Sequence, residues 1–450
     1  ACADKGRQVL IKAEIINGAA WACLQHLAGA TYWSEGSFDE AERYVQECLT
    51  IYQQIMRQPS MPEQKQRNLT YNAHVPASLI THSRHVLLGD PLELGWMYET
   101  LGVIASNKAQ SAEALAHLHT ALAIFKEHDL VRGMSQVCSN IGTIYSTRSE
   151  FATSSTYYKR ARDFAERIGD VTTKALAIGN LGVDADRIGN LPDARTWLTD
   201  SLALSEQISN REQTSWCLAT LASVQQNLGD MRGALENLRR ALIMSNNIKS
   251  SARLGYALVA LAEWRVMRAL YHRNLEAVPV DTRTSQALLR SALVTVERAQ
   301  ALEGIDAETQ STAQVILAQI SYLRGDLVHA QQQTPKLLEV TQQREMFYLY
   351  CRVQRLWGEI QAALGCEQEA DRSFDEALQT CQQYGLRLDY ARVLYRYGVC
   401  LWQRSAPTAY QQGLGYLQEA REIFAACQAS LDLQWVERIL ATYTPPNTSS

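Results

Sequence analysis

Residues 180–201 read NLGVDADRIGNLPDARTWLTDS, and this stretch decides the fold. Apolar side chains recur at helical spacing from Leu181 to Ile188, and Gly189-Asn190 then stops the helix, because glycine adopts the left-handed conformation that closes a helix C-terminus. A second helix is predicted to begin near Pro192, whose fixed φ suits a first helical turn, and to run to about Ile208. The stretch therefore predicts a hairpin of two helices.

The hairpin recurs along the chain with a period of 40 residues. Three series of markers keep this period: a small residue in the first helix, a small residue in the second helix, and a glycine-containing turn between them. The markers are Gly102, Gly142, Gly182 and Ala222; Ala121, Ala161, Ser201 and Ala241; and the turns at Gly189-Asn190, Gly229-Asp230, Gly325-Asp326 and Gly365-Cys366. Neither helix of a hairpin can bury its apolar stripe alone, so successive hairpins must stack. The small residues are expected to let the helices approach closely.

The pattern resembles the tetratricopeptide repeat in a 40-residue form, best seen in Asn140-Ile141-Gly142…Tyr145…Phe151…Tyr158…Ala161 and in residues 180–198. The resemblance implies an all-α fold, a right-handed α-solenoid of stacked antiparallel helix hairpins. The expected organisation is an N-terminal hairpin (1–58), a helical insert (59–91), four regular units (92–250), an irregular unit with an insert (251–304), C-terminal units (305–443) and a tail (444–450).

Composition narrows the class of protein. The 450 residues are 46% hydrophobic and 20% charged, with a formal net charge of -4, which offers no attraction to nucleic acid or anionic lipid. The ten cysteines are scattered singly, as expected of buried free thiols in a reducing compartment, so a cytoplasmic location is predicted, with no membrane segment. Because the chain starts with Ala1 inside an expected helix, we expect a larger protein that continues upstream.

The resemblance also implies a ligand or partner groove, lined by the first helices of successive hairpins. The groove positions, carried over to this chain, are aromatic and amide-rich, with arginines near the C-terminal end; such side chains anchor recognition surfaces. They are Trp96, Asn107, Asn140, Thr143, Asn180, Arg187, Trp216, Asn227, Tyr256, Arg352, Arg355 and Tyr395.

Each group of candidates has a structural alternative. The aromatic residues can pack between hairpins, and Asn140 and Asn180, which share one repeat position, can hold an extended peptide or bond a neighbouring helix. Arg352 and Arg355, with Glu359 on the same helical face, can bind a carboxylate or phosphate or can be paired internally. The lysine and asparagine pattern that clamps a chaperone's C-terminal carboxylate is not found.

Other chemistry receives little support. His74, His82 and His85 suggest a metal site, but no cysteine or carboxylate completes the set, so no metal and no cofactor are predicted. Cys138, Cys217, Cys351 and Cys400 lie on repeat helices and are expected in the core. No phosphate loop, nucleophile motif or catalytic carboxylate pair occurs, so no enzymatic activity is expected.

Two functions remain. The 40-residue repeats resemble those that follow the nucleotide-switch ATPase of bacterial regulators such as the maltotriose-responsive activator of maltose genes. That resemblance implies a sensor arm of a cytoplasmic signalling or transcription regulator, which binds an effector or a partner in its groove. The alternative is a stand-alone adaptor that grips a peptide segment of a partner protein, as partition proteins and the kinesin light chain do with similar repeats. Self-association through the terminal repeats stays open.

Overall fold

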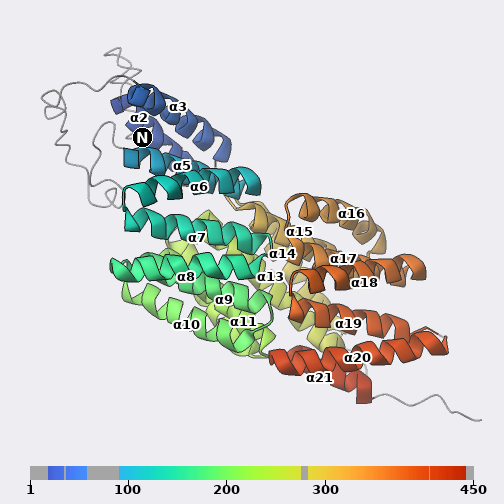
Figure 1. The fold of residues 1–450 in the computed structure, drawn as a ribbon. Coiled ribbons are helices and arrows are strands. Elements are labelled where there is room, and N and C mark those ends of the chain that lie inside the picture. The colour runs from blue at the N-terminus through green and yellow to red at the C-terminus, as the bar shows by residue number, and fades with distance from the viewer. Residues whose placement is uncertain (1–18, 35–36, 58–90, 275–281, 405, 442–450) are drawn as a thin grey trace, which may run out of the picture. The chain divides into compact units, whose positions relative to one another are not determined.

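The computed structural model describes residues 19–34, 37–57, 91–274, 282–404 and 406–441. These residues form nineteen helices, and no strand occurs among them (Figure 1). The chain divides into two compact units, Ala1–Ile141 and Gly142–Ser450. Among the described helices, none is long and apolar enough to span a membrane. The predicted all-α solenoid of stacked antiparallel helix hairpins is confirmed.

The first unit holds two hairpins and the start of a third. Its helices are α2 (Ala19–Ser34), α3 (Phe38–Arg57), α5 (Pro91–Asn107), α6 (Ser111–Glu127) and the first part of α7 (Val131–Thr147). Its core gathers apolar side chains of α2, α3 and α5 around the fully buried Tyr52 and the buried Met97. The predicted insert at 59–91, with a helix near Ala77–Leu88, falls almost entirely on residues 58–90, which lie outside the described residues.

The second unit continues the stack to the C-terminal region. Its helices are the end of α7, then α8 (Phe151–Arg167), α9 (Val171–Arg187), α10 (Leu191–Gln207), α11 (Arg211–Asn227), α12 (Met231–Asn247), α13 (Ser251–Asn274), α14 (Thr282–Gln300), α15 (Ala307–Leu323), α16 (Leu327–Gln343), α17 (Phe347–Ala363), α18 (Glu367–Gln383), α19 (Arg387–Trp402), α20 (Pro407–Cys427) and α21 (Ser430–Ala441). The long α13 breaks the regular pattern, and residues 275–281 of the second predicted insert lie outside the described part of the chain.

Helices α5 to α12 share one length and one kind of turn. Each of these helices has 17 residues, and a residue with positive φ follows each of them at intervals of 20 residues, from Ala109 to Lys249. At the turn predicted at Gly189, φ is +82°, and the backbone N–H of Asn190 donates to the carbonyl of Ala185 at 2.8 Å, which closes the helix end. The same turn occurs within the preceding hairpin at Ser149, where no glycine marks it in the sequence.

The repeated glycine of the first helices permits close approach within a hairpin, as predicted. A Cβ added at Gly142 would lie 2.7 Å from the ring of Tyr158, and one added at Gly182 would lie 2.7 Å from Leu198 Cγ. Both of these large side chains are buried on the second helix of their hairpin. The glycines therefore make room for the residues that fill the core.

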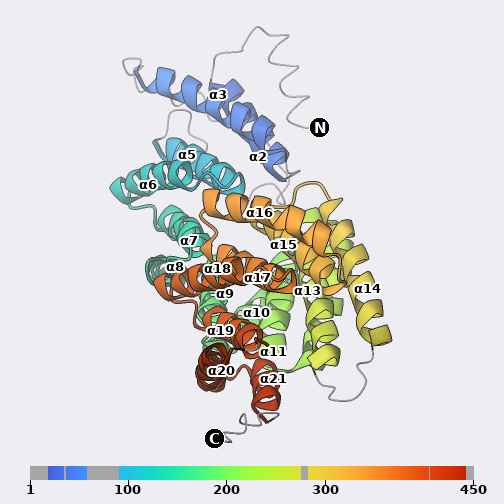
Figure 2. The same ribbon diagram turned by 90° about the vertical axis from the view of Figure 1, so that its right-hand side faces the viewer.

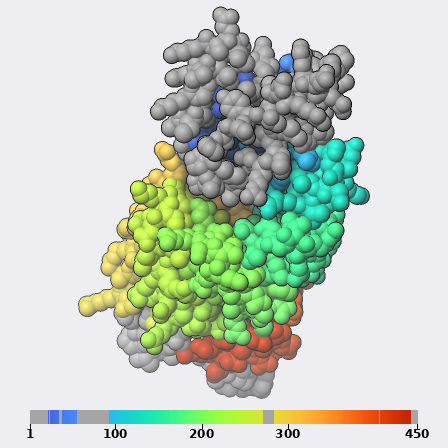
Figure 3. Space-filling view, turned by 90° about the vertical axis from the view of Figure 1, so that its left-hand side faces the viewer, coloured from blue at the N-terminus to red at the C-terminus, as the bar shows by residue number. Residues whose placement is uncertain are grey.

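Within the second unit, the C-terminal helices α19–α21 pack back against the turns of α9–α12 (Figures 1 and 2). A Cβ at Gly189 would lie 3.1 Å from the backbone nitrogen of Leu388, and Leu191 and Met231 share one buried cluster with Leu388 and Trp435. In the space-filling view, the green central helices and the red C-terminal helices adjoin directly (Figure 3). Hairpins far apart in sequence therefore face one another.

Candidate functional site

Polar side chains on the inner helices bond to the next inner helix of the stack. The Nδ2 of Asn227 on α11 donates to Asp186 Oδ1 on α9 at 2.9 Å, across 41 residues of sequence. The Nε of Arg352 on α17 donates to Asp389 Oδ1 on α19 at 3.1 Å, across 37 residues. Both spacings are close to one repeat, so these inner side chains connect consecutive hairpins. We call the surface formed by the inner sides of α7, α9, α11, α13, α15, α17, α19 and α21 the inner face of the second unit.

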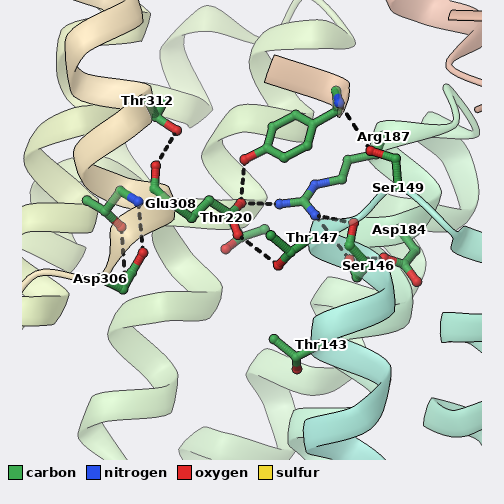
Figure 4. Close-up of polar contacts among 12 residues, drawn as sticks. Thr143, Ser146, Thr147, Ser149, Asp184, Arg187, Thr220, Asp306, Glu308 and Thr312 are labelled. Atoms are coloured by element: carbon green, nitrogen blue, oxygen red, sulfur yellow. Dashed lines mark hydrogen bonds and ion pairs between the residues drawn. The ribbon is translucent and has the colours of Figure 1, made fainter. Parts of the chain in front are cut away.

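Arg187 is the centre of a cluster that joins α7 and α9 to α15 and α17 (Figure 4). Its Nη2 donates to Glu308 Oε1, and its Nη1 donates to the Oγ of Ser146 at 3.0 Å. The guanidinium also lies 4.2 Å from the ring centre of Tyr348, whose hydroxyl donates to Glu308 at 2.5 Å. A charge-assisted bond and a cation–π contact thus hold one arginine between helices 121 residues apart.

Beside this cluster, Asp184 is buried between α7, α8 and α9. It accepts hydrogen bonds from the hydroxyls of Ser146 at 2.5 Å and Ser154 at 2.6 Å. Burial raises the pKa of this carboxyl to about 6, although the two serines and the positive charge of Arg187 lower it. The charge of Asp184 therefore changes within the pH range in which most proteins are folded.

Further bonds connect the two sides of the inner face. The backbone N–H of Tyr348 donates to Ser149 Oγ at 3.1 Å, and Arg148 forms an ion pair with Glu345 at 3.3 Å. Lower in the stack, the Nη2 of Arg392 on α19 donates to Asn227 Oδ1 on α11 at 2.9 Å. The inner face is therefore partly closed by contacts between α7–α11 and α17–α19.

A pocket remains between α13, α15, α17, α19 and α21, with a volume of about 100 Å³. One wall is charged, and the other is apolar and comes from α13 and α15. The charged wall consists of Arg352, Arg355, Glu359, Asp389, Arg392, Arg396 and Asp432, with Glu263 opposite. Burial would raise the pKa of Asp389, but Arg352 and Arg392 outweigh it and hold that pKa below its usual value.

Four of the predicted groove residues of the second unit lie at this pocket or in the network beside it. Arg352 and Arg355 line the pocket with Tyr395, and Asn227 lies in the network beside it. Tyr395 belongs to the buried apolar cluster, so most of its ring packs in the core. Arg352 is paired with Asp389 and lies 3.6 Å from Glu263, as the internal-pairing alternative predicts.

Three other predicted residues of the second unit contact side chains or backbone of neighbouring helices. Trp216 packs against α9, because a Cβ at Gly179 would lie 2.6 Å from its Cζ3. The hydroxyl of Tyr256 lies 3.2 Å from Thr220 Oγ1, and burial raises the pKa of Tyr256 to about 12. Thr143 is exposed and accepts a hydrogen bond from the hydroxyl of Tyr158 at 3.2 Å.

Asn180 differs from the other asparagine at its repeat position. It lies seven residues before Arg187 and so on the same face of α9. The side chain is half-buried and makes no hydrogen bond to another described residue. In the first unit, Asn140 instead donates to Glu99 at 2.7 Å, and burial raises the pKa of Glu99 to about 7. Asn140 thus bonds a neighbouring helix, which is one of the two alternatives predicted for it.

The two remaining candidates also belong to the first unit. Trp96 packs on Phe125 with ring centres 4.6 Å apart, and Asn107 is half-buried at the end of α5.

The histidines and cysteines noted in the sequence form no metal-binding group among the described residues. His74, His82 and His85 lie outside the described residues, and no group of three metal-binding side chains occurs within them. None of the eight described cysteines forms a disulfide with another described residue. Cys138, Cys217 and Cys351 are buried, as predicted, and Cys400 is half-buried.

Sequence reasoning missed several residues of the inner face. Asp389 and Asp432 follow their arginines by 37 and 40 residues, so a search for opposite charges one repeat apart would have found them. Glu308 and Tyr348 carry no such signal, because their partner Arg187 lies on a distant hairpin.

Comparison with known proteins supports the repeat architecture. Two models of the tetratricopeptide repeat match the sequence, over residues 173–247 and 22–56. The predicted resemblance to this repeat is confirmed over those residues. No curated protein sequence matches the chain.

Solved structures share the fold at low sequence identity. The crystal structure of a Rap protein complexed with Competence and Sporulation Factor has a TM-score of 0.56 at 12% identity and covers 92% of this chain and 99% of its own. The Rap conjugation gene regulator of the plasmid pLS20, in complex with the Phr* peptide, has a TM-score of 0.50 at 12% identity, with 81% of this chain and 96% of its own covered. At these identities the likeness shows the fold alone.

Proposed function

We propose that this chain binds a peptide, or an extended segment of a protein, on the inner face of the second unit. The observation that carries the proposal is the convergence of arginine and aromatic side chains from α17, α19 and α21 around one pocket, with the amide of Asn227 on α11 bonded to Arg392 beside it. Side chains of these kinds bond peptide backbone groups and anchor partner residues. The two solved structures described above were each determined in a complex, one with Competence and Sporulation Factor and the other with the Phr* peptide.

Asn180 is the contact that we expect to matter most. Its amide offers a donor and an acceptor that match those of an extended backbone, and its face of α9 continues to Arg187. The arginines further along are already bonded within the chain, for example Arg392 to Asp432 at 2.9 Å. A partner therefore gains the most binding free energy from side-chain groups that form no hydrogen bond within the chain.

The wider role we propose is that of a sensor arm, in which binding at the inner face controls a larger regulator. A partner that binds between α7–α11 and α17–α19 changes the spacing of these helices only if it prefers one spacing over another. The alternative is an adaptor that holds its partner without such a change. Small-angle scattering with and without the bound peptide separates the two roles, since only the sensor arm should change its radius of gyration.

The proposal is tested by affinity selection from a pool of synthetic heptapeptides with free termini, using the whole chain. We expect at least one peptide to be enriched and Asn180→Ala to weaken its binding about tenfold, the effect of losing one to two hydrogen bonds. Asn247→Ala is the matched control, since Asn247 is exposed at the end of α12. Absence of any enriched peptide, or equal effects of the two substitutions, would count against the inner face as the binding surface.

A further inference from the structure

The pocket of the second unit contains four arginines, and three of them are hydrogen-bonded to carboxylates. Arg352 donates to Asp389 at 3.1 Å and Arg396 donates to Glu359 at 2.6 Å. Arg392 donates through two nitrogens to the carboxylate of Asp432, at 3.1 and 2.9 Å. These three guanidinium groups hold the charged wall in place.

Arg355 is the fourth, and its situation differs. Its buried Nε has no hydrogen-bond acceptor in the described part of the chain. The carboxylate oxygen of Glu359 is 3.6 Å away, too far for a hydrogen bond, and Glu359 already accepts from Arg396. A buried donor without an acceptor is unfavourable, so an acceptor brought by a ligand would gain binding free energy by bonding to it.

A second donor at the same pocket also lacks an acceptor. Trp435 on α21 lines the pocket, is only 5% exposed, and its indole Nε1 has no hydrogen-bond partner among the described residues. Two buried donors thus belong to one pocket.

The opposite wall and the volume restrict what can enter. That wall consists of Val266, Met267, Leu270, Val315, Ile316 and Leu323. The volume of about 100 Å³ is somewhat smaller than the ~150 Å³ cavity that holds a benzene molecule, so the pocket accepts one apolar side chain and not a folded segment. The wall favours a branched aliphatic group, and the donors favour an acceptor attached close to it.

The charges that line the pocket indicate which kind of acceptor it binds. Four arginines face four carboxylates, those of Glu263, Glu359, Asp389 and Asp432. A dianionic phosphate would lie beside several of these carboxylates, whereas a single carboxylate needs only the unbonded donor of Arg355 and the neutral indole N–H.

We infer that the pocket binds the C-terminal residue of a peptide, with its carboxylate on Arg355 and Trp435 and its aliphatic side chain on the α13–α15 wall. This inference rests on the proposed function, and it names the end of the peptide that the pocket recognises. Asn180 and Arg187 then contact residues further from that terminus.

The pocket is tested with N-acetyl-L-leucine and N-acetyl-L-leucinamide as probes, titrated into the whole chain and followed by NMR. The two probes differ only in the charge and acceptors of the terminal group. We expect the acid to bind at least tenfold more tightly than the amide, and Arg355→Gln and Trp435→Phe each to reduce this preference at least threefold. Arg372→Gln is the matched control, since Arg372 is 70% exposed on α18.

Three results would overturn the inference: equal binding of acid and amide, no binding of either probe, or an unchanged preference in both pocket variants. If Arg355→Gln prevents folding, comparing the two probes on the natural chain and on Trp435→Phe still tests the inference. Peptides selected from the heptapeptide pool separate this inference from the proposed function. If a selected peptide binds equally well with an amidated C-terminus, the pocket's role is refuted and peptide binding stands. If no peptide of the pool binds, the proposed function is refuted.

Discussion

Replacing Arg187 by Gln should loosen the contact between the α7–α9 and α15–α17 parts of the second unit. The Arg187 side chain is 13% exposed and that of Glu308 is 31% exposed, so the pair is largely but not fully buried. Breaking a fully buried pair costs about 3–5 kcal/mol, and the partial exposure of Glu308 lowers our expectation to about 2–4 kcal/mol. Part of that cost is the loss of the bond from Arg187 to Ser146 Oγ at 3.0 Å.

The assay is hydrogen exchange of the amides of α15 and α17, because a stack of repeats opens locally and does not unfold in one step. A loss of 2 kcal/mol or more should lower amide protection about 30-fold or more, since 1.36 kcal/mol is a factor of ten. Arg240→Gln is the control: Arg240 pairs with Glu206 at 3.0 Å, but the side chains are 50% and 47% exposed. Such exposed pairs contribute about 0.2–1 kcal/mol.

The double variant Arg187→Gln with Glu308→Gln completes the cycle. The two single losses should exceed the double loss by about 1–3 kcal/mol, because each substitution removes the same interaction. Additive effects, or equal effects of Arg187→Gln and Arg240→Gln, would refute the argument that this cluster holds the inner face together.

Two further predictions concern the framework. Gly142→Ala should be less stable than Gly415→Ala by about 1–3 kcal/mol in urea unfolding. The new Cβ at position 142 would lie 2.7 Å from the buried Tyr158, whereas nothing lies within 4 Å of a Cβ at Gly415. Equal stabilities of the two variants would contradict the helix pairing. Burial raises the pKa of Asp184 in the folded state to about 6, above its ordinary value of 3.8. This group's contribution to the unfolding free energy therefore falls as pH rises from about 4 through 6. Asp184→Asn should therefore gain about 2 kcal/mol relative to the natural chain between pH 4 and pH 7, as measured by urea unfolding at each pH. A difference that does not change with pH would disprove the assigned burial.

The sequence alone determined the repeating unit. The 40-residue period placed the turn at Gly189 and the close approach at Gly142 and Gly182, because helix ends and tight packing depend on residues near in sequence and on glycine's freedom. It did not mark the turn at Ser149, since left-handed residues other than glycine carry no distinct sequence signal.

Only the tertiary structure decided what the inner face contains. Arg187 was expected in the groove, but its bonds to Glu308 and its contact with Tyr348 join helices more than 100 residues apart. Each hairpin packs on its neighbour with a small rotation, and the sequence of a repeat specifies only that neighbour contact. The rotations of many hairpins add up, and their sum decides which distant hairpins meet and which arginines are bonded. It also decides that Arg355 Nε and Trp435 Nε1 have no acceptor among the described residues.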